Sequence, residues 1–276
     1  QMKVGVIGTG NMGTILIESF ILSKSVLAEN MNIYNRTRTK AQSIKDQFPD
    51  IHICYNELEV VQSSDLLFVC VKPGEMHAVL TIMAEHLSVN KCVVSITGPI
   101  SVAQLENVLP CHCARLIPSI TNKVFSGVSL LSFGENCSIQ WKETIRQLAS
   151  NISEAIEIDN DITRISSDIV SCGPAFFSYL AQEFINAAVK ETQIDADTAT
   201  VLTEKMLVGL GNLLQSGQYS LPTLQEKVCV KGGITGKGIA VFDQELGDVF
   251  NHVFLATHRK FGEEIIKLEK QFEHKY

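Results

Sequence analysis

The stretch Lys3-Val4-Gly5-Val6-Ile7-Gly8-Thr9-Gly10-Asn11-Met12-Gly13-Thr14-Ile15 decides the fold. Its apolar run from Val4 to Ile7 predicts a buried strand, and the residues after Gly13 have helical spacing. Between them stands Gly8-x-Gly10-x-x-Gly13. Strand, tight glycine turn and helix, in this order, are the context of a dinucleotide-binding fingerprint.

Each glycine of this turn has a physical role in binding a cofactor. Gly8 permits the turn, Gly10 lets a pyrophosphate approach the backbone, and Gly13 allows the helix to pack closely on the strand. The phosphates would meet free N–H groups at the positive end of the helix. The candidate cofactor-binding residues here are Gly8, Thr9, Gly10, Asn11, Met12 and Gly13. The alternative is an ordinary strand-to-helix turn.

Composition narrows the class of protein. The chain has 276 residues, a net charge of -7 and an ordinary globular mix, 19% charged and 45% hydrophobic. Without a basic surplus to neutralise phosphates, we expect no nucleic-acid partner. No apolar run is long enough to cross a bilayer, and the first strand begins almost at once. We therefore expect neither a membrane partner nor a signal peptide, and a cytoplasmic location.

The eight cysteines also favour a cytoplasmic location. None forms a C-x-x-C pair, and most stand in apolar, strand-like runs, which favours buried reduced thiols. Cys111-His112-Cys113 would direct two potential ligands to one side of a strand. A zinc site needs more ligands than these. We expect no metal.

The chain divides into an alternating half and a helical half. Strand patterns occur at 4–7, 31–34, 51–54, 66–71, 92–96, 112–117, 128–133 and 155–158, with helical patterns between most of them. Such repeated units predict an α/β fold, a Rossmann-type doubly wound parallel sheet with right-handed crossovers. We predict an NADP(H)-binding Rossmann domain over 1–160 and an all-α substrate and dimerisation domain over 161–276.

Helical patterns in the second half cover about 174–192, 196–216 and 220–229, followed by a pair from 236 to 272. Their apolar faces are large for a domain of this size. A small helical domain with such faces often completes its core with a second copy, so we predict a homodimer or a higher homo-oligomer built from dimers.

The end of the second predicted strand selects the dinucleotide. An NAD site usually carries Asp or Glu here, whereas this chain has Asn35, Arg36, Thr37 and Arg38. Arg36 can make charge-assisted hydrogen bonds to a 2′-phosphate, and Asn35 and Thr37 can add neutral ones. This pattern favours NADP(H), with NAD(H) as the weaker possibility. The alternative is a solvated basic loop.

Several further stretches carry a family resemblance. They are Ile7-Gly8-x-Gly10-Asn11-Met12-Gly13, Asn35-Arg36, Val69-Cys70-Val71-Lys72-Pro73, Arg115-Leu116-Ile117-Pro118, Ser171-Cys172-Gly173-Pro174-Ala175-Phe176 and Gly232-Gly233-Ile234-Thr235. Together they resemble pyrroline-5-carboxylate reductase. The resemblance implies a Rossmann domain followed by a helical dimerisation domain, and reduction of a cyclic imino acid, pyrroline-5-carboxylate, to proline with NAD(P)H. The run from Leu221 to Gly233 is similar to a divergent branch, the ComER-type proteins encoded with the late competence genes of bacilli.

The resemblance also implies site residues. Val71, Lys72 and Pro73 match the strand end along the nicotinamide-side ribose. The family's substrate loop, Ser-Pro-Gly-Gly-Thr-Thr, corresponds to Val230-Lys231-Gly232-Gly233-Ile234-Thr235. That loop holds the substrate carboxylate, so Val230, Gly232, Gly233 and Thr235 are candidate substrate-binding residues, and Thr235 and Lys231 are the candidate catalytic residues.

Two departures in this loop leave the activity open. Val230 replaces a serine and so removes a hydrogen-bond donor. The loss of one hydrogen bond to a charged carboxylate weakens its binding by roughly 1.5–3 kcal/mol. Lys231 replaces a proline, and either compensates as a cation or points to solvent. The first hypothesis is an NADPH-dependent imine reductase that works mainly by positioning. The second is an NADP(H)-binding, competence-associated regulatory protein with weak or lost activity. The third is a β-hydroxyacid-type dehydrogenase, for which Lys190 stands too late in its helix.

Overall fold

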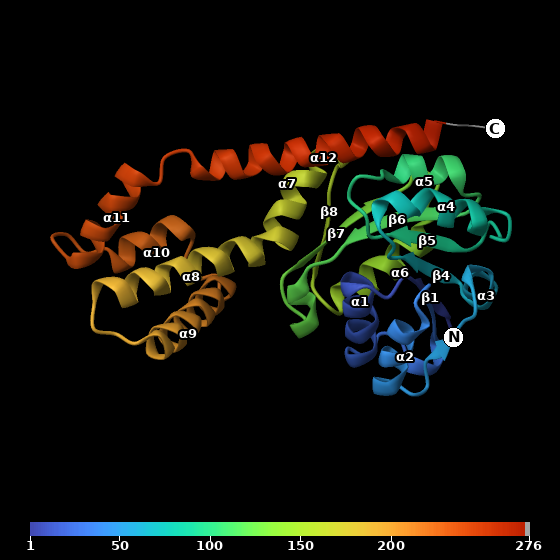
Figure 1. Cartoon of the computed structure of the whole chain (residues 1–276), viewed down its shortest axis with the longest axis horizontal. Coiled ribbons are helices and arrows are strands. Elements are labelled where there is room, and N and C mark those ends of the chain that lie inside the picture. Colours follow the sequence, from blue (N-terminus) through green and yellow to red (C-terminus); the bar gives the residue numbers. More distant parts are fainter. Residues whose placement is uncertain (274–276) are drawn as a thin grey trace. The chain divides into compact units, whose positions relative to one another are not determined.

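The computed structural model describes residues 1–273, which fold into two compact units (Figure 1). The first unit comprises Gln1–Pro174 together with the chain from Ala256 onward, and the second comprises Ala175–Leu255. The first contains the sheet, and the second is made of helices. The expected order of an α/β half followed by a helical half is confirmed.

The eight strands of the first unit form one sheet. They are β1 (Val4–Ile7), β2 (Met31–Tyr34), β3 (His52–Ile53), β4 (Leu66–Val69), β5 (Cys92–Ser95), β6 (His112–Ile117), β7 (Val128–Phe133) and β8 (Glu154–Glu157). Their order in the sheet is β3-β2-β1-β4-β5-β6-β7-β8. The order reverses at β1, which pairs with β2 on one side and β4 on the other. Ligands of doubly wound sheets bind at such a reversal, beside the carboxyl ends of the strands.

Two strands, β7 and β8, run opposite to the other six strands of the sheet. β7 runs antiparallel to β6, whereas β7 and β8 are parallel. The connection from β6 to β7 holds only the short 3-10 helix η2 (Ile120–Val124). A parallel crossover needs a dozen or more residues, usually a helix, and this connection has neither. The predicted doubly wound parallel sheet is confirmed, with one antiparallel pair, β6 and β7.

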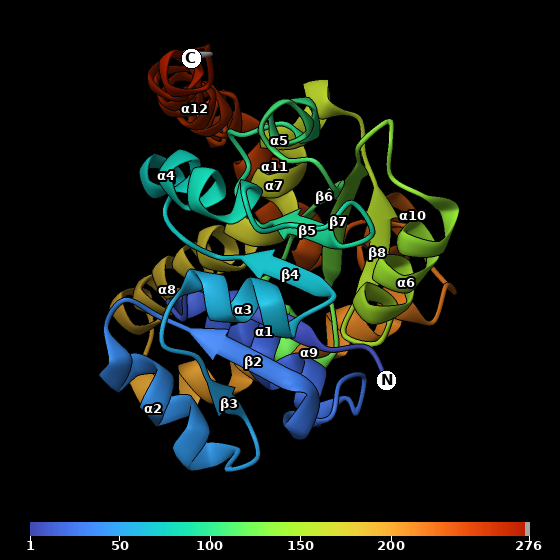
Figure 2. The same ribbon diagram turned by 90° about the vertical axis from the view of Figure 1, so that its right-hand side faces the viewer.

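Helices cover both faces of the sheet and make two buried cores (Figure 2). The first core contains apolar residues of α1 (Asn11–Leu22), α2 (Arg38–Gln47) and α6 (Ile139–Ser150). The second contains those of α3 (Glu57–Ser63), α4 (Pro73–Ala84) and α5 (Val102–Val108), and also Leu268 of α12 (Val249–Glu273). The last helix of the chain thus completes the second core of the first unit.

A helical segment that sequence reasoning missed precedes the second unit. α7 (Thr163–Ser167), a π-helical turn (Asp168–Cys172) and α8 (Gly173–Glu191) follow one another without a break. The predicted start near 174 agrees with the first residue of α8, but Pro174 also suits a helix first turn, so the sequence did not indicate that α7 and the π turn precede it without a break. Proline within a helix removes a hydrogen bond and clashes with the preceding turn, and a wider π turn is one way to accommodate such a disruption.

The second unit contains most of α8 and the helices α9 (Ala196–Gln215), α10 (Leu221–Val228) and α11 (Ile234–Glu245). Helix starts follow their caps: Asp195 accepts from the N–H of Thr198 at 2.8 Å, and Ser220 forms a capping box with Thr223. Among residues 1–273, no helix combines the length and the apolar character that a membrane span needs.

Candidate functional site

Three strand ends meet at the reversal of the sheet. The N–H of Gly8, just after β1, donates to the carbonyl of Tyr34 on β2 at 2.8 Å. The N–H of Cys70, just after β4, donates to the carbonyl of Ile7 at 2.7 Å. The loops that follow β1, β2 and β4 therefore start side by side. These loops, together with the first turns of α1 and α4, contain all the residues predicted to bind the cofactor.

The glycine turn has the geometry that its sequence predicts. Gly8 has φ +96, a value that favours glycine, and a Cβ there would stand 2.7 Å from the carbonyl oxygen of Cys70. A Cβ at Gly13 would overlap the carbonyl of Gly8. A Cβ at Gly10, in contrast, would meet no atom of residues 1–273 within 4 Å. Gly8 and Gly13 permit the close packing, and Gly10 leaves open space for a ligand.

The start of α1 offers donors to that space. Gly10 is the N-cap and has no side chain to satisfy the first N–H groups of the helix, which belong to Asn11, Met12 and Gly13. The Thr9 hydroxyl is buried and has no hydrogen-bond partner in the described part of the chain. An open cradle of donors at a helix N-terminus fits the pyrophosphate of a dinucleotide.

The loop after β2 is braced by its own asparagine. Asn35 Oδ1 accepts from the N–H of Thr9 at 3.0 Å, and Asn35 Nδ2 donates to the carbonyl of Thr37 at 2.9 Å. Thr37 is the exposed N-cap of α2. The Asn35 amide, predicted as a phosphate ligand, thus holds the glycine turn against this loop.

The two arginines of this loop have different neighbours. Arg36 Nη2 lies 3.5 Å from Glu75 Oε1, on the first turn of α4. The Arg38 guanidinium lies over the ring of Tyr55, 5.3 Å from its centroid. Glu75 was missed by sequence reasoning. An acidic residue in the first turn after Lys72-Pro73 was the only signal that could have found it.

Val71, Lys72 and Pro73 continue from the end of β4 into α4. Lys72 is the exposed N-cap with φ -60 and ψ 149, and Pro73 is the first helical residue. The residue before a proline prefers this extended conformation, and proline suits the first helical position. The motif therefore sets the direction in which the chain leaves β4.

The predicted substrate loop, within the second unit, is a tight turn. The N–H of Gly233 donates to the carbonyl of Val230 at 3.0 Å, and Gly232 has φ +76. A positive φ at the third residue is the signature of a type II turn, which favours proline at its second residue, here Lys231. Gly233 is the N-cap of α11, without a side-chain cap. Thr235 is exposed on the first turn of that helix.

A buried arginine organises another strand end. Arg115 on β6 is 1% exposed, and burial lowers the pKa of its guanidinium to about 10. It donates to the carbonyls of Gly98 and Ile100 at 2.9 and 3.2 Å and to the Thr163 hydroxyl at 2.8 Å. Arg115 thereby connects the loop after β5 to the start of α7. The sequence motif contained Arg115 but did not indicate this role.

The buried Asp168 of the π turn pairs with an arginine of α7 and accepts a hydrogen bond from α12. Asp168 is 1% exposed and accepts from Arg164 Nε at 2.8 Å and from the Thr257 hydroxyl at 2.5 Å. Arg164 also lies over the ring of Phe261. Beside it, burial raises the pKa of the Cys172 thiol, which fits a packed residue better than a reactive thiolate.

The described residues include one group of three potential metal ligands, His52, Cys54 and Glu59, whose ligand atoms lie within 4.8 Å of one another. His52 Nε2 and Glu59 Oε1 are already hydrogen-bonded at 2.9 Å. Burial, and after it the Glu59 carboxylate, raises the pKa of the Cys54 thiol to about 12. A metal would need the thiolate, so this group is better described as an ion pair beside a buried thiol.

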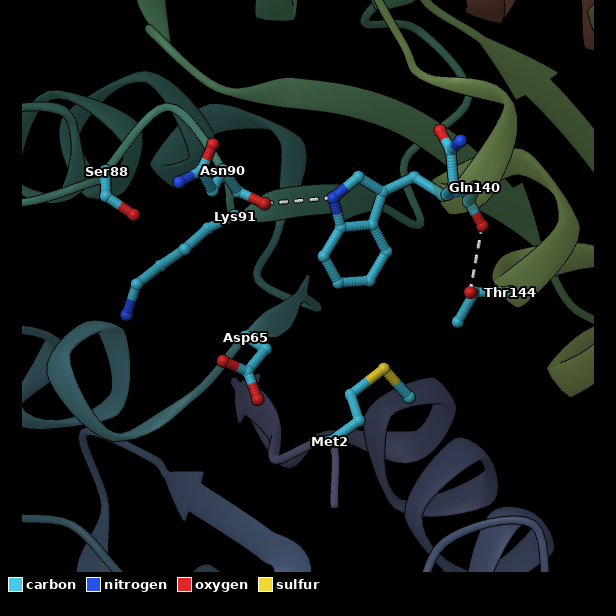
Figure 3. Close-up of a pocket in the computed structure, with 8 residues that line it drawn as sticks. Met2, Asp65, Ser88, Asn90, Lys91, Gln140 and Thr144 are labelled. Atoms are coloured by element: carbon cyan, nitrogen blue, oxygen red, sulfur yellow. Dashed lines mark hydrogen bonds between the residues drawn. The ribbon is translucent and has the colours of Figure 1, made fainter.

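A cavity of about 440 Å³ lies at the amino-terminal ends of the central strands (Figure 3). It is lined by residues preceding β1, β4 and β5, including Met2 and Asp65, and by α6. The Trp141 indole N–H in its wall donates to the carbonyl of Asn90 at 3.0 Å. These strands begin here, whereas the fingerprint follows their carboxyl ends, so this cavity is separate from the candidate cofactor site.

Both halves of the chain are similar to known protein families. The model of the pyrroline-5-carboxylate reductase dimerisation domain matches residues 160–264, and that of the NADP oxidoreductase, coenzyme F420-dependent family matches residues 3–99. ComE operon protein 4 of Bacillus subtilis (strain 168) is 48% identical over 98% of this chain and 99% of that protein. Pyrroline-5-carboxylate reductase 3 of the same organism is 28% identical over 94% and 95%. The chain belongs to the pyrroline-5-carboxylate reductase family.

Solved structures of this family share the fold. The Plasmodium falciparum pyrroline carboxylate reductase with NADP bound has a TM-score of 0.81 at 19% identity, covering 99% of each chain. The Coxiella burnetii pyrroline-5-carboxylate reductase has a TM-score of 0.82 at 19% identity, covering 98% of each chain. The predicted fold class and family resemblance are confirmed, and the chain is a member of an NAD(P)H-dependent oxidoreductase family.

Proposed function

We propose that this protein reduces pyrroline-5-carboxylate, or a close cyclic imino acid, to the corresponding cyclic amino acid with NADPH. The observation that carries this proposal is the turn from Val230 to Gly233 that leads into α11. Its hydrogen bond of 3.0 Å and the φ of +76 at Gly232 are the features that a type II turn requires. The turn therefore keeps its shape although proline has been replaced at its second position.

This turn supplies backbone donors for a carboxylate. Gly233 leaves the first N–H groups of α11 without a side-chain cap, and the helix dipole favours an anion there. Thr235 adds a hydroxyl on the same first turn. The substrate carboxylate would bind these donors, which orients the ring and its C=N bond.

The proposed reaction requires little acid–base catalysis by the protein. A bound NADPH supplies a hydride, which adds with its electron pair to the imine carbon while the C=N π electrons move to nitrogen. A protonated imine already carries the proton that the product amine needs, so no residue has to donate one at this step. The chain's own residues bind and orient the reactants, which is catalysis by positioning.

Lys231 and Val230 adapt the pocket rather than abolish it. Lys231 is exposed at the second position of the turn, where its cation adds to the attraction for a carboxylate. Val230 is 65% exposed and offers no donor in place of the family's serine. We infer a weaker carboxylate site than that of a Ser-Pro loop.

We also propose that NADPH is preferred over NADH, on the basis of the residues that follow β2. Arg36 is 86% exposed at the end of β2, so its guanidinium is free to turn toward a 2′-phosphate. No carboxylate of the β2 end itself stands in the usual place for a ribose hydroxyl, since Asn35 occupies it.

We also propose a homodimer formed through the second unit. Phe177, Leu180 and Phe184 follow helical spacing on α8 and are 64%, 41% and 59% exposed. Met206 on α9 is 50% exposed and Phe242 on α11 is 57% exposed. Apolar faces of this extent on a small helical unit mark an interaction surface. The match to a dimerisation model over 160–264 indicates a second copy as the partner.

A regulatory protein that binds NADP(H) with weak or lost reductase activity is the second candidate. Two observations favour it: Val230 offers no donor where the family has a serine, and the chain is 48% identical to ComE operon protein 4. It shares the cofactor site with the first candidate and differs only in turnover.

One measurement separates the two candidates. NADPH binding is established first, and NADPH oxidation is then followed with pyrroline-5-carboxylate at saturating cofactor. Turnover dependent on both compounds supports the reductase. Tight NADPH binding without turnover on this or related cyclic imines contradicts it and leaves the regulatory candidate.

A further inference from the structure

Arg36 faces a carboxylate from a different element. Its Nη2 lies 3.5 Å from Oε1 of Glu75, which stands on the first turn of α4. Arg36 follows β2, and Glu75 follows β4, so β1 lies between the two strands that position them. The side chains are 86% and 43% exposed, and both remain accessible to a ligand.

Arg38 does not share this position. Its guanidinium packs over the Tyr55 ring at 5.3 Å, on the side of the β3–α3 connection. Arg36 is therefore the arginine of this loop that a phosphate near α4 would meet. Any phosphate bound by Arg36 must share the guanidinium with Glu75.

We propose that Glu75 is a specificity-determining residue that weakens binding of the 2′-phosphate of NADPH and so narrows the preference for NADPH over NADH. This inference rests on the proposed cofactor assignment. Dinucleotide sites that prefer NADH commonly carry an acid at the end of β2. Here the acid comes from α4 instead, and it faces the arginine that favours NADPH.

The physical basis is competition and repulsion. A phosphate monoester carries about -1.5 to -2 charges at pH 7. The Glu75 carboxylate, which lies beside the arginine that would bind this phosphate, therefore repels it. A ribose 2′-hydroxyl is neutral and is not repelled. Glu75 therefore acts on one nucleotide and leaves the other largely unaffected.

The expected size is modest because both side chains are exposed. Solvent screens such pairs, and their measured contributions are small. Replacing Glu75 by glutamine should tighten NADPH binding about threefold to fivefold. Salt screens exposed charges, so the gain should shrink at high ionic strength.

The experiment compares Glu75→Gln with Glu85→Gln, which makes the same charge change at the other, exposed end of α4. Dissociation constants for NADPH and NADH are measured by calorimetry on the full chain at low and high salt. We expect Glu75→Gln to tighten NADPH binding by that factor at low salt, with NADH within twofold and Glu85→Gln unchanged. A merely structural role for Glu75 would move both nucleotides together.

The outcomes separate this inference from the proposed function. An unchanged ratio of NADPH to NADH affinity in Glu75→Gln overturns the role of Glu75, whatever the wild type catalyses. Nucleotide binding with the expected shift but no imine reduction supports Glu75 and contradicts the proposed reaction. A wild type that binds neither nucleotide overturns both.

Discussion

The backbone N–H of Thr9 donates a 3.0 Å hydrogen bond to the side-chain oxygen of Asn35. This bond joins the glycine turn after β1 to the loop after β2, the two segments that are predicted to contact the pyrophosphate and the adenosine ribose. The Asn35 amide donates in turn to the carbonyl of Thr37. One side chain thus sets the spacing between the pyrophosphate cradle and the arginine that follows β2.

Asn35→Ala should weaken both folding and NADPH binding. One part-buried and one exposed hydrogen bond are lost, which should lower the free energy of unfolding by about 1–2 kcal/mol. The glycine turn also loses its brace, so NADPH affinity should fall about tenfold. Urea unfolding and calorimetry measure the two effects. Asn136→Ala, at an exposed loop position, is the control; equal effects from both variants would contradict a bracing role.

Arg36→Ala should remove the preference for NADPH. A lost charge-assisted bond to the 2′-phosphate costs roughly 1.5–3 kcal/mol, or more than tenfold in affinity, whereas NADH should bind almost as before. Arg38→Ala is the matched control, because that guanidinium packs on Tyr55. Fluorescence titration with both nucleotides provides the test. Equal affinities of the wild type for NADPH and NADH would rule out the 2′-phosphate assignment.

The substrate loop offers a gain-of-function test. Val230→Ser with Lys231→Pro should raise imine reduction, because the hydroxyl restores a donor worth more than tenfold in binding a charged group. Proline fits the second position of the type II turn, so stability should be kept or rise by about 0.4–1 kcal/mol. The measurements are KM for the imine and thermal unfolding. An unchanged KM in a folded variant would show that the departures at 230 and 231 do not limit the pocket.

Phe184→Glu should dissociate the proposed dimer. Phe184 is already 59% exposed within its own chain, so the substitution should leave the fold intact while placing a charge in the apolar face. Light scattering at low micromolar concentration should show a dimer for the wild type and a monomer for the variant. Ile82→Glu, at a 48% exposed position of α4, should remain dimeric. A monomeric wild type would disprove the interface.

Asp168→Asn should destabilise the first unit strongly. The carboxylate is buried and pairs with Arg164, and removing one partner of such a pair leaves an uncompensated charge at a cost of about 3 kcal/mol or more. Asp161→Asn, at an exposed position in the same segment, is the control and should change little. Chemical denaturation measures both. A loss below about 1 kcal/mol would place this pair among the weak surface interactions.

How much could be predicted from the sequence differs between elements. The run Val4–Ile7 with its glycines predicted β1, the turn and α1, since local sterics and burial on both faces act within those few residues. The helices of the second half were found within a few residues, because apolar spacing and N-caps are local signals. The reversal of β7 and β8 could not be predicted, since strand direction depends on how a connection crosses the sheet and not on strand composition.

Other features exist only in the folded chain. The continuous helix through Pro174 depends on a π turn that absorbs the disruption, and the return of α12 to the first core depends on Leu268 reaching residues far earlier in the chain. Glu75 meets Arg36 only because the order of strands places the ends of β2 and β4 on either side of β1.

The sequence by itself therefore determined the dinucleotide fold, the family and the chemical type of the site residues, because each rests on patterns a few residues long. The tertiary structure alone decided which charges face one another, since such contacts join residues that are distant along the chain. For that reason, only the folded chain shows that Asn35 joins two loops and that Glu75 pairs with Arg36.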